Sequence, residues 1–185
     1  MGYRKKNIDR ASFVEVALER GWVQGRSILV IDLNLCTRCD ECVRACAATH
    51  GGRPRFIREG DRHENWLVTR ACYHCQDPAC LVGCPTGAIQ RRGYGQLVKI
   101  DEKLCIGCQV CARNCPFDAI TMVDLQAVWP DTALPQYLRG QPKMLASKCD
   151  LCDASGHGPA CVYHCPNGCA YRVSSPEQFQ QLMSA

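Results

Sequence analysis

Sixteen of the 17 cysteines in this 185-residue chain fall into four groups of four, and this grouping limits the structures that the chain can adopt. Every group opens with two cysteines separated by two residues and closes with two separated by three. A proline follows the last cysteine of the second, third and fourth groups. The groups are Cys36, Cys39, Cys42 and Cys46; Cys72, Cys75, Cys80 and Cys84; Cys105, Cys108, Cys111 and Cys115; and Cys149, Cys152, Cys161 and Cys165. Such grouped thiolates predict a chain wrapped around iron-sulfur clusters.

The third group has the spacing of the bacterial ferredoxin motif. Cys105, Cys108 and Cys111 follow one another at two-residue gaps, so one loop can offer a sulfur to three irons of a [4Fe-4S] cluster. Cys115 points away and reaches the neighbouring cluster in this pattern. We expect Gly107 to give the loop conformational freedom, and Pro116 to turn the chain away from the cluster because it fixes φ and has no N–H. Four such groups predict four clusters.

A disulfide scaffold or a zinc site would also use many cysteines, but both fit this sequence less well. A disulfide scaffold suits short secreted chains, and the start of this sequence has no apolar secretory segment. A zinc site would suit the fourth group taken alone, because two separated pairs of cysteines are typical of structural zinc. That group closes on Cys-Pro like the second and third groups, which favours iron and sulfide in all four.

The remaining cysteine, Cys169, has a different predicted role. Alignment of the groups on their closing prolines places Cys169 where the second and third groups have Ala88 and Ala119. The position therefore favours a small apolar side chain. We expect Cys169 to pack beside a cluster rather than to bind iron or to react.

The clusters dominate the predicted charge and core of the protein. Each oxidised cluster with four thiolates carries about −2, so the formal charge of +4 becomes about −4 when four are bound. Much of the chain is loop around cysteines, which leaves few residues for an ordinary apolar core. We therefore expect the clusters to form the core and the apoprotein to be largely unfolded.

Composition also narrows the partners and the compartment. Basic residues such as Arg53, Arg58 and Arg91 are scattered and lack an accompanying aromatic platform, which argues against nucleic-acid binding. No apolar run has the length of a membrane span, and the first residues carry neither a signal segment nor a myristoylation motif. We expect a cytoplasmic protein without a direct membrane span, which could be exported when attached to a partner that carries a signal.

The segments between the groups predict a few regular elements. Residues 9–21 predict a short helix that ends at Gly21 and packs on this chain or on a partner through one apolar side. The residues of that side are Phe13, Val14, Ala17 and Leu18. Residues 28–32 predict a strand. Residues 88–100 predict a hairpin around Gly93, Tyr94 and Gly95. Residues 129–148 contain three prolines and predict an ordered surface loop.

These elements together predict an α+β fold of two bacterial-ferredoxin-like modules, rich in loops. The second and third groups and their hairpin form the inner two-cluster module, residues 72–121. The first and fourth groups form an outer module around it, with its first half in residues 28–71 and its second half, with the C-terminal tail, in residues 149–185. The other predicted segments are an N-terminal helical extension, residues 1–27, and a connecting loop insertion, residues 122–148.

With its motifs in this order, the chain resembles the four-cluster electron-transfer subunits of the dimethyl sulfoxide reductase iron-sulfur family. The resemblance covers about residues 28–172, and its most specific pieces are the second group and Lys148-Cys149-Asp150-Leu151-Cys152 with the later Cys161 and Cys165. The first group, which ends Cys46-Ala47, also looks like that family. The segment from Ser27 to Cys46 is similar, in addition, to ferredoxin modules fused to cyclic-nucleotide-binding domains.

The resemblance implies a nested set of iron ligands. The first outer set is Cys36, Cys39, Cys42 and Cys165, and the second outer set is Cys149, Cys152, Cys161 and Cys46. The first inner set is Cys72, Cys75, Cys80 and Cys115, and the second inner set is Cys105, Cys108, Cys111 and Cys84. The residues by themselves leave open a sequential pairing of the first group with the second.

The resemblance also implies a function. Subunits of this family pass single electrons between a catalytic molybdopterin or nickel-iron subunit and a carrier protein or quinone-reactive subunit, and they perform no bond chemistry. An alternative is an iron-sulfur sensor of oxygen or redox state, which would need an output domain. A self-contained enzyme is disfavoured, because His74, His157 and His164 near the cysteines have no nucleophile or open metal constellation beside them. We predict no catalytic residue.

Overall fold

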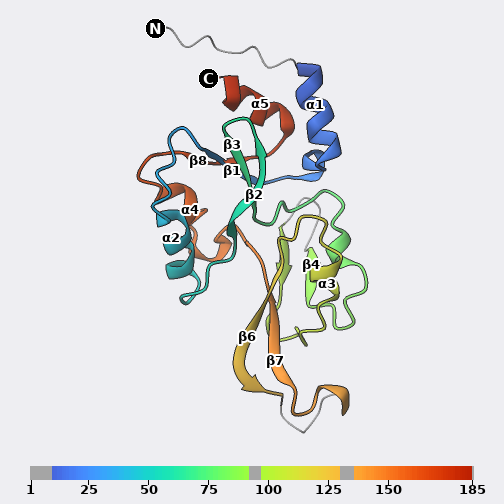
Figure 1. Ribbon diagram of the computed structural model, residues 1–185. Helices are drawn as coiled ribbons and strands as arrows, with labels where there is room; N and C mark the ends of the chain where they lie inside the picture. The colour runs from blue at the N-terminus through green and yellow to red at the C-terminus, as the bar shows by residue number, and fades with distance from the viewer. Residues whose placement is uncertain (1–9, 92–96, 130–135, 185) are drawn as a thin grey trace.

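The computed structural model describes residues 10–91, 97–129 and 136–184, which form a mixed structure of helices and strands (Figure 1). The strands are β1 (Ile28–Asp32), β2 (Ile57–His63), β3 (Trp66–Arg70), β4 (Ile89–Arg91), β5 (Val98–Ile100), β6 (Thr121–Val128), β7 (Pro142–Ser147) and β8 (Ala170–Val173). The α-helices are α1 (Arg10–Glu19), α2 (Glu41–Thr49), α3 (Val110–Arg113), α4 (Ala160–Tyr163) and α5 (Pro176–Ser184). Single turns of 3-10 helix are η1 (Trp22–Gln24), η2 (Ala79–Leu81), η3 (Gln136–Leu138) and η4 (Asp153–Ser155).

Strand β1 is the centre of a four-stranded antiparallel sheet with the order β2-β3-β1-β8. Its β-branched and leucine residues are almost fully buried, which confirms the strand predicted for residues 28–32. Side chains alternate between the two faces of a strand. Ile28 and Val30 therefore pack with α1 and α5, whereas Leu29 and Ile31 pack with the cysteine-bearing helices.

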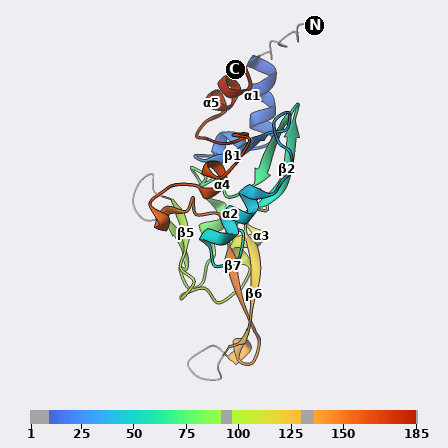
Figure 2. The same cartoon turned by 90° about the vertical axis from the view of Figure 1, so that its left-hand side faces the viewer.

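Helix α1 docks on this chain, beside α5 (Figures 1 and 2). Phe13 and Ala17 are buried as predicted, but Val14 and Leu18 are 39% and 59% exposed, so the predicted apolar side is wrong for these two residues. Phe13 joins Trp22, Trp66 and Phe179 in a core of aromatic rings. The expectation that clusters alone form the core is therefore wrong, because this face of the sheet has an ordinary apolar core.

Strands frame the cysteine groups along the chain. A strand precedes every group, namely β1, β3, β5 and β7 in order, and β4, β6 and β8 follow the second, third and fourth groups. Strands β4 and β5 pair antiparallel, which confirms the predicted hairpin strands; its turn lies outside the described residues. Strands β1 and β8 also pair. The strand before the first group therefore lies beside the strand after the fourth.

The segment predicted as a connecting loop at residues 122–148 forms a long hairpin instead. Strands β6 and β7 pair antiparallel, with an irregularity between Asp124 and Val128 (Figure 1). The sequence prediction relied on prolines, but Pro142 stands at the first position of β7, where a missing N–H is tolerated. Lys143 lies over the Trp129 ring, 4.6 Å from its centre. The hairpin projects from the body of the molecule in both views (Figures 1 and 2).

Within the described residues, no helix combines the length and the apolar character that crossing a bilayer requires.

Candidate iron-sulfur centres

The four cysteine groups share a backbone conformation that the sequence does not reveal. The residue just before the second cysteine of each group has a positive φ: 58° at Arg38, 49° at His74, 72° at Gly107 and 61° at Leu151. Only one of these is glycine. Left-handed residues next to right-handed ones turn successive N–H groups toward one side, which makes a concavity that favours anions. Each opening loop is therefore shaped to surround a negatively charged centre.

The third cysteine of each group lies in a short helix. Cys42 lies in α2, Cys80 in η2, Cys111 in α3 and Cys161 in α4, and all four are buried. In each group the third sulfur is therefore held by helical backbone rather than by the loop that carries the first two cysteines. This repeated arrangement explains how groups with different spacings produce similar sites.

The turn after each Cys-Pro bond directs backbone N–H groups at the last sulfur. A positive φ recurs in this turn, at 66° for Gly87, 48° for Asp118 and 56° for Gly168. Burial acts to raise the pKa of Cys84, but the N–H groups of Ile89, Thr86 and Ala88 outweigh it, and the pKa is lowered. The proline thus has a second role beyond the exit predicted from sequence, because it starts a turn that solvates a thiolate.

The last cysteine of the fourth group has the same environment. Burial again acts to raise the pKa of Cys165, and the N–H groups of Cys169, Asn167 and Ala170 help to lower it overall. Cys169 itself is buried, and its Sγ lies 3.4 Å from Cys165 Sγ. Cys169 thus packs against the sulfur of another cysteine, in the place of the alanines of the other groups.

Two cavities bring together cysteines from the second and third groups. One is lined by Cys72, Cys75, Cys80 and Cys115 together with apolar residues. The other is lined by Cys84, Cys105, Cys108 and Cys111. Each cavity therefore receives three cysteines from one group and the last cysteine of the other group.

The cysteines of the first and fourth groups also lie near one another. The pKa of Cys46 is raised to about 12, chiefly by burial. A hydrogen bond from the Arg55 N–H lowers this pKa, and the charges of three cysteines of the fourth group, Cys149, Cys161 and Cys152, raise it further. Burial also raises the pKa of Cys42 to about 11, with contributions from Cys161 and Cys165. Helices α2 and α4 pack together, which explains this proximity. Cys39 is exposed in the loop between Cys36 and Cys42.

The buried thiols suit thiolate ligands of a metal centre rather than free thiols. Burial raises the pKa of Cys75, Cys80 and Cys111 to about 11, 12 and 11, respectively. Several buried sulfurs that converge on one cavity need positive charge to become thiolates, and iron supplies it. Four converging sulfurs and inward N–H groups fit a [4Fe-4S] cluster, which is held by four cysteines.

The four sets follow one another through the molecule. The charge of Cys161, of the second outer set, raises the pKa of Cys42, of the first outer set. Cys72 of the first inner set packs in the same apolar cluster as Cys149 and Cys161. Helix η2, which carries Cys80, packs against α3 of the second inner set. Cysteines of the first, second and fourth groups therefore meet in one apolar cluster, and the second and third groups meet through η2 and α3.

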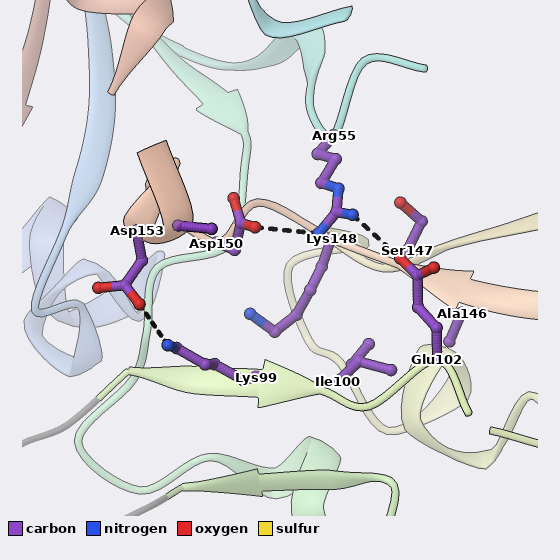
Figure 3. A pocket seen from close by; sticks show the side chains of 10 residues that line it. Arg55, Lys99, Ile100, Glu102, Ala146, Ser147, Lys148, Asp150 and Asp153 are labelled. Atoms are coloured by element: carbon purple, nitrogen blue, oxygen red, sulfur yellow. Dashed lines mark hydrogen bonds and ion pairs between the residues drawn. The ribbon is translucent and has the colours of Figure 1, made fainter. Parts of the chain in front are cut away.

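A network of charged residues joins the loops around the second outer set (Figure 3). The Asp150 carboxylate accepts hydrogen bonds from the Cys152 N–H and from Arg55, each at 3.0 Å, and it lies 3.0 Å from His50 Nε2. Arg55 also donates to Glu102 at 3.0 Å. Burial acts to raise the pKa of Asp150, but these partners lower it overall. Arg55, Glu102 and Asp150 of this network line a cavity of about 160 Å³.

His50, Asp150 and Cys152 offer ligand atoms within 4.8 Å of one another. We do not assign a separate metal to them, because the family resemblance implies that Cys152 is a ligand of the second outer set and because Arg55 already pairs with Asp150. Sequence reasoning missed this network. The one available signal was the position of Asp150 between two cysteines, since an Asp side chain readily accepts from the backbone N–H two residues further on.

The histidines near the cysteines have different environments. His74 is 2% exposed, and neither ring nitrogen has a hydrogen-bond partner of ordinary geometry within the described residues, although the Cys149 backbone lies close. Burial, and then the charges of Lys148 and Arg172, lower the pKa of His74 to about 2. His157 and His164 are exposed. None of the three contacts a side chain in a nucleophile-and-base arrangement among the interactions of the described residues.

Strands that frame four cysteine groups, and cavities lined by four sulfurs, define an iron-sulfur protein of the ferredoxin class. The family of 4Fe-4S binding domains matches residues 98–121. The chain is 33% identical over 176 residues to hydrogenase-4 component A of Escherichia coli (strain K12), which covers 80% of this chain and 82% of that protein. Formate hydrogenlyase subunit 2 of the same organism is 30% identical over 172 residues, with the same two shares.

A third relative is the B subunit of anaerobic dimethyl sulfoxide reductase of Escherichia coli (strain K12). It is 35% identical over 156 residues, or 74% of this chain and 67% of that protein. The chain therefore belongs to the family of 4Fe-4S ferredoxin-like electron-transfer subunits. The family resemblance inferred from the cysteine motifs is confirmed.

Proposed function

We propose that this chain is the electron-transfer subunit of an oxidoreductase complex and holds four [4Fe-4S] clusters. It would pass single electrons between a catalytic subunit with a molybdopterin or nickel-iron centre and an electron-carrier protein or quinone-reactive subunit. The bound clusters would supply one-electron chemistry with potentials in the range of roughly −700 to +450 mV. The fold would comprise an inner and an outer ferredoxin-like module, as the order of the cysteine groups suggests.

One observation carries this proposal. Each of the two cavities that bring cysteines together in the middle of the chain is lined by four sulfurs, three from one group and one from the other. A zinc site needs four ligands at one point but not two interlocked sets. The interlocked pattern is the one that two-cluster ferredoxins use.

The ligand assignment has further support in the first and fourth groups. The charges of Cys149, Cys152 and Cys161 act on Cys46, and that of Cys165 acts on Cys42. The pairing of β1 with β8 supports the same nested assignment, because it brings the strand before the first group beside the strand after the fourth. We therefore assign the first outer, second outer, first inner and second inner sets as the ligands of four clusters.

In this proposal the polypeptide positions and insulates the redox centres. The opening loops and Cys-Pro turns aim N–H groups at the sulfurs, which stabilises the thiolates. In this relay the four sets would lie in a row, and the two end sets would face the two redox partners. The exposed Cys39 belongs to the first outer set, which would be one end of that row.

Iron and sulfide analysis of anaerobically purified protein tests the cluster count. We expect about sixteen irons and about sixteen sulfides per chain, since each [4Fe-4S] cluster contributes four of each. A protein that binds zinc, or that gives no electron paramagnetic resonance signal after reduction with dithionite, would contradict the proposal.

Serine variants test the ligand assignment. Cys80→Ser should lower the iron content by up to about four per chain, because it removes a ligand of one cluster. Cys169→Ser is the matched control, since it also replaces a buried cysteine beside a site, and it should leave the iron content unchanged. An equal loss in both variants would contradict the assignment.

The native complex tests the partner class. The relatives of this chain include a hydrogenase component, a formate hydrogenlyase subunit and a dimethyl sulfoxide reductase subunit. We expect this chain to purify with a larger subunit that contains molybdopterin or nickel and iron, identified by mass spectrometry and metal analysis. Purification with a transcription factor instead would support the sensor alternative.

A further inference from the structure

Arg172 of β8 reaches a sulfur of the second outer set. Its Nη2 donates a hydrogen bond to Cys149 Sγ at 2.9 Å, and its Nη1 donates to the Ser27 carbonyl at 3.0 Å. The residue is partly buried, and its Nε is shielded from solvent without a partner among the described residues. The backbone contact to Ser27 fixes the direction of the side chain, so the guanidinium stays against the sulfur.

Among the described residues, the charge of Arg172 has no carboxylate partner. None of the ion pairs between described residues includes it. Burial works to lower the pKa of Arg172, but the thiolates of Cys149, Cys161 and Cys72 raise it more. A shielded charge is retained only where an opposite charge compensates it. The compensating charge here is the sulfur set itself.

A second basic residue lies at the same junction. Lys148, whose side chain lines the cavity in Figure 3, is 3% exposed. Its Nζ donates to the Cys149 carbonyl at 3.0 Å and to the Val98 carbonyl at 2.5 Å. It also has no acidic partner among the described ion pairs. Val98 belongs to β5 between the two inner sets, so Lys148 joins the outer and inner parts of the chain. Positive charge therefore accumulates where the second outer set meets the first inner set.

We propose that Arg172 is a positioning residue that raises the reduction potential of the centre held by the second outer set, Cys149, Cys152, Cys161 and Cys46. The inference rests on the proposed function, because it requires a redox centre on these sulfurs. Reduction adds one electron and therefore one negative charge. A fixed cation bonded to a ligand sulfur stabilises the reduced state more than the oxidised state. Arginine stays protonated, so the electron needs no accompanying proton.

A raised reduction potential at this centre would affect where an electron resides during transfer. In the proposed relay the second outer set would lie between the first outer and first inner sets, and an electron that travels along the row would cross it. A raised potential there favours occupancy of the centre at the junction between the two halves of the chain. Arg172 would thus help to hold an electron in the middle of the row rather than at an exposed end.

Redox titration of the full chain, followed by electron paramagnetic resonance, tests the proposal. Arg172→Met removes the charge at similar length, Arg172→Gln keeps a shorter polar group, and Arg172→Lys keeps the charge. We expect the midpoint potential of one centre to fall in the Met and Gln variants, by a change of about tenfold in the one-electron equilibrium constant, or about 59 mV. The Lys variant should shift less.

Arg20→Met is the matched control. It removes one positive charge from an ion pair with Asp61 in which both side chains are exposed, and because solvent and salt screen such a charge it should shift the potentials much less than Arg172→Met. Unchanged potentials in Arg172→Met, or an equal shift of all centres in both variants, would overturn the proposal.

Two further outcomes are separable. If Arg172→Met loses iron, the test becomes the comparison of Arg172→Lys, which keeps the charge, with Arg172→Gln, which removes it. Equal midpoint potentials in these two variants would overturn the proposal. If the native chain contains no reducible [4Fe-4S] centres, the proposed function itself fails. If native centres are present but insensitive to Arg172, only this inference fails.

Discussion

At the scale of single residues, the cysteine sites depend on positions that no residue type marks in advance. Arg38, His74 and Leu151 adopt the same left-handed conformation as Gly107 at the equivalent point of their groups. A non-glycine residue in this region costs roughly 1–2 kcal/mol. Three of the four groups bear this cost, which indicates that the loop conformation matters more than the local preference of the residue.

Gly107 has a second constraint that its conformation does not explain. A Cβ built on Gly107 would lie 2.4 Å from the Met144 carbonyl oxygen of β7, whereas a Cβ on Gly87 would meet nothing within 4 Å. The sequence prediction of freedom near the cluster therefore gave an incomplete reason. Close packing against the β6-β7 hairpin is the stronger requirement.

We predict that Gly107→Ala destabilises the loaded protein more than Gly87→Ala. Both variants incur the left-handed penalty of roughly 1–2 kcal/mol, and Gly107→Ala adds a clash with backbone that a side-chain rotation cannot relieve. Anaerobic urea unfolding, followed by cluster absorbance, measures the difference. Equal midpoints would show that the Met144 contact is not limiting.

We also predict an alkaline transition that only the metal-free protein shows. Burial raises the pKa of two thiols of α2 from the ordinary value of 9.0, to about 11 for Cys42 and to about 12 for Cys46. Folded thiols that bind protons more tightly than unfolded ones stabilise the fold below about pH 9, and this contribution is lost as the pH rises toward about 12. In the loaded protein these sulfurs are already thiolates, so no such loss is expected.

Thermal unfolding at a series of alkaline pH values, with the metal-free and loaded forms compared under anaerobic conditions, measures this effect. The melting temperature of the metal-free form should fall above about pH 9 while that of the loaded form stays level. Parallel curves for the two forms would contradict the explanation from thiol ionisation.

At the scale of elements, α1 and α5 stabilise the sheet that positions the outer sets. Phe179 of α5 is 1% exposed, and its ring centre lies 5.5 Å from that of Phe13 and 5.6 Å from that of Trp66. Strands β1 and β8 carry the opposite face toward the cysteines. The aromatic core therefore supports the sheet from the face opposite the first and fourth groups, and Cys75 of the second group packs against it.

We predict that Phe179→Ala lowers the stability of the loaded protein by about 3–5 kcal/mol, because it leaves a cavity in this aromatic core. Tyr163→Ala is the control, since Tyr163 is 71% exposed and its truncation should change stability by less than about 0.5 kcal/mol. Denaturant titration measures both, and iron content should remain native in both variants at low denaturant. Similar losses of stability in the two variants would count against the assigned core.

At the scale of the whole molecule, the chain has an apolar half and a cysteine-dominated half. The core of α1, β1, β3, β8 and α5 contains almost no cysteine, whereas the segment from β4 to α3 packs largely around cysteines. The sequence expectation of a largely unfolded apoprotein treats these halves alike. Because only the cysteine-dominated half depends on the clusters for its core, we now expect unfolding of the apoprotein mainly in that half.

We predict that anaerobic removal of the clusters unfolds residues 72–121 first and leaves amide protection in β1 and β3. Binding free energy of a metal centre becomes folding free energy only where the centre supplies the core. Hydrogen exchange with mass spectrometry, before and after chelation, measures protection segment by segment. Uniform loss of protection along the chain would instead support an apoprotein that is unfolded throughout.

The sequence by itself determined the chemistry of this protein. Thiolate spacing predicts [4Fe-4S] clusters, because few metal centres can use three cysteines at two-residue gaps with a fourth that points away. The β1 strand, the helix near residue 13 and the β4-β5 hairpin strands were also predictable, since each follows from a local pattern of apolar residues or turn residues.

Only the tertiary structure decided how the groups meet and what surrounds them. The proximity of Cys46 to Cys149, and the contact of Arg172 with Cys149, join residues more than 20 positions apart that share no local pattern. Val14 and Leu18 are exposed, and residues 142–147 form a strand, because docking partners rather than local periodicity determine burial and pairing. Long-range packing, which no short window of sequence encodes, therefore sets the surroundings of each sulfur.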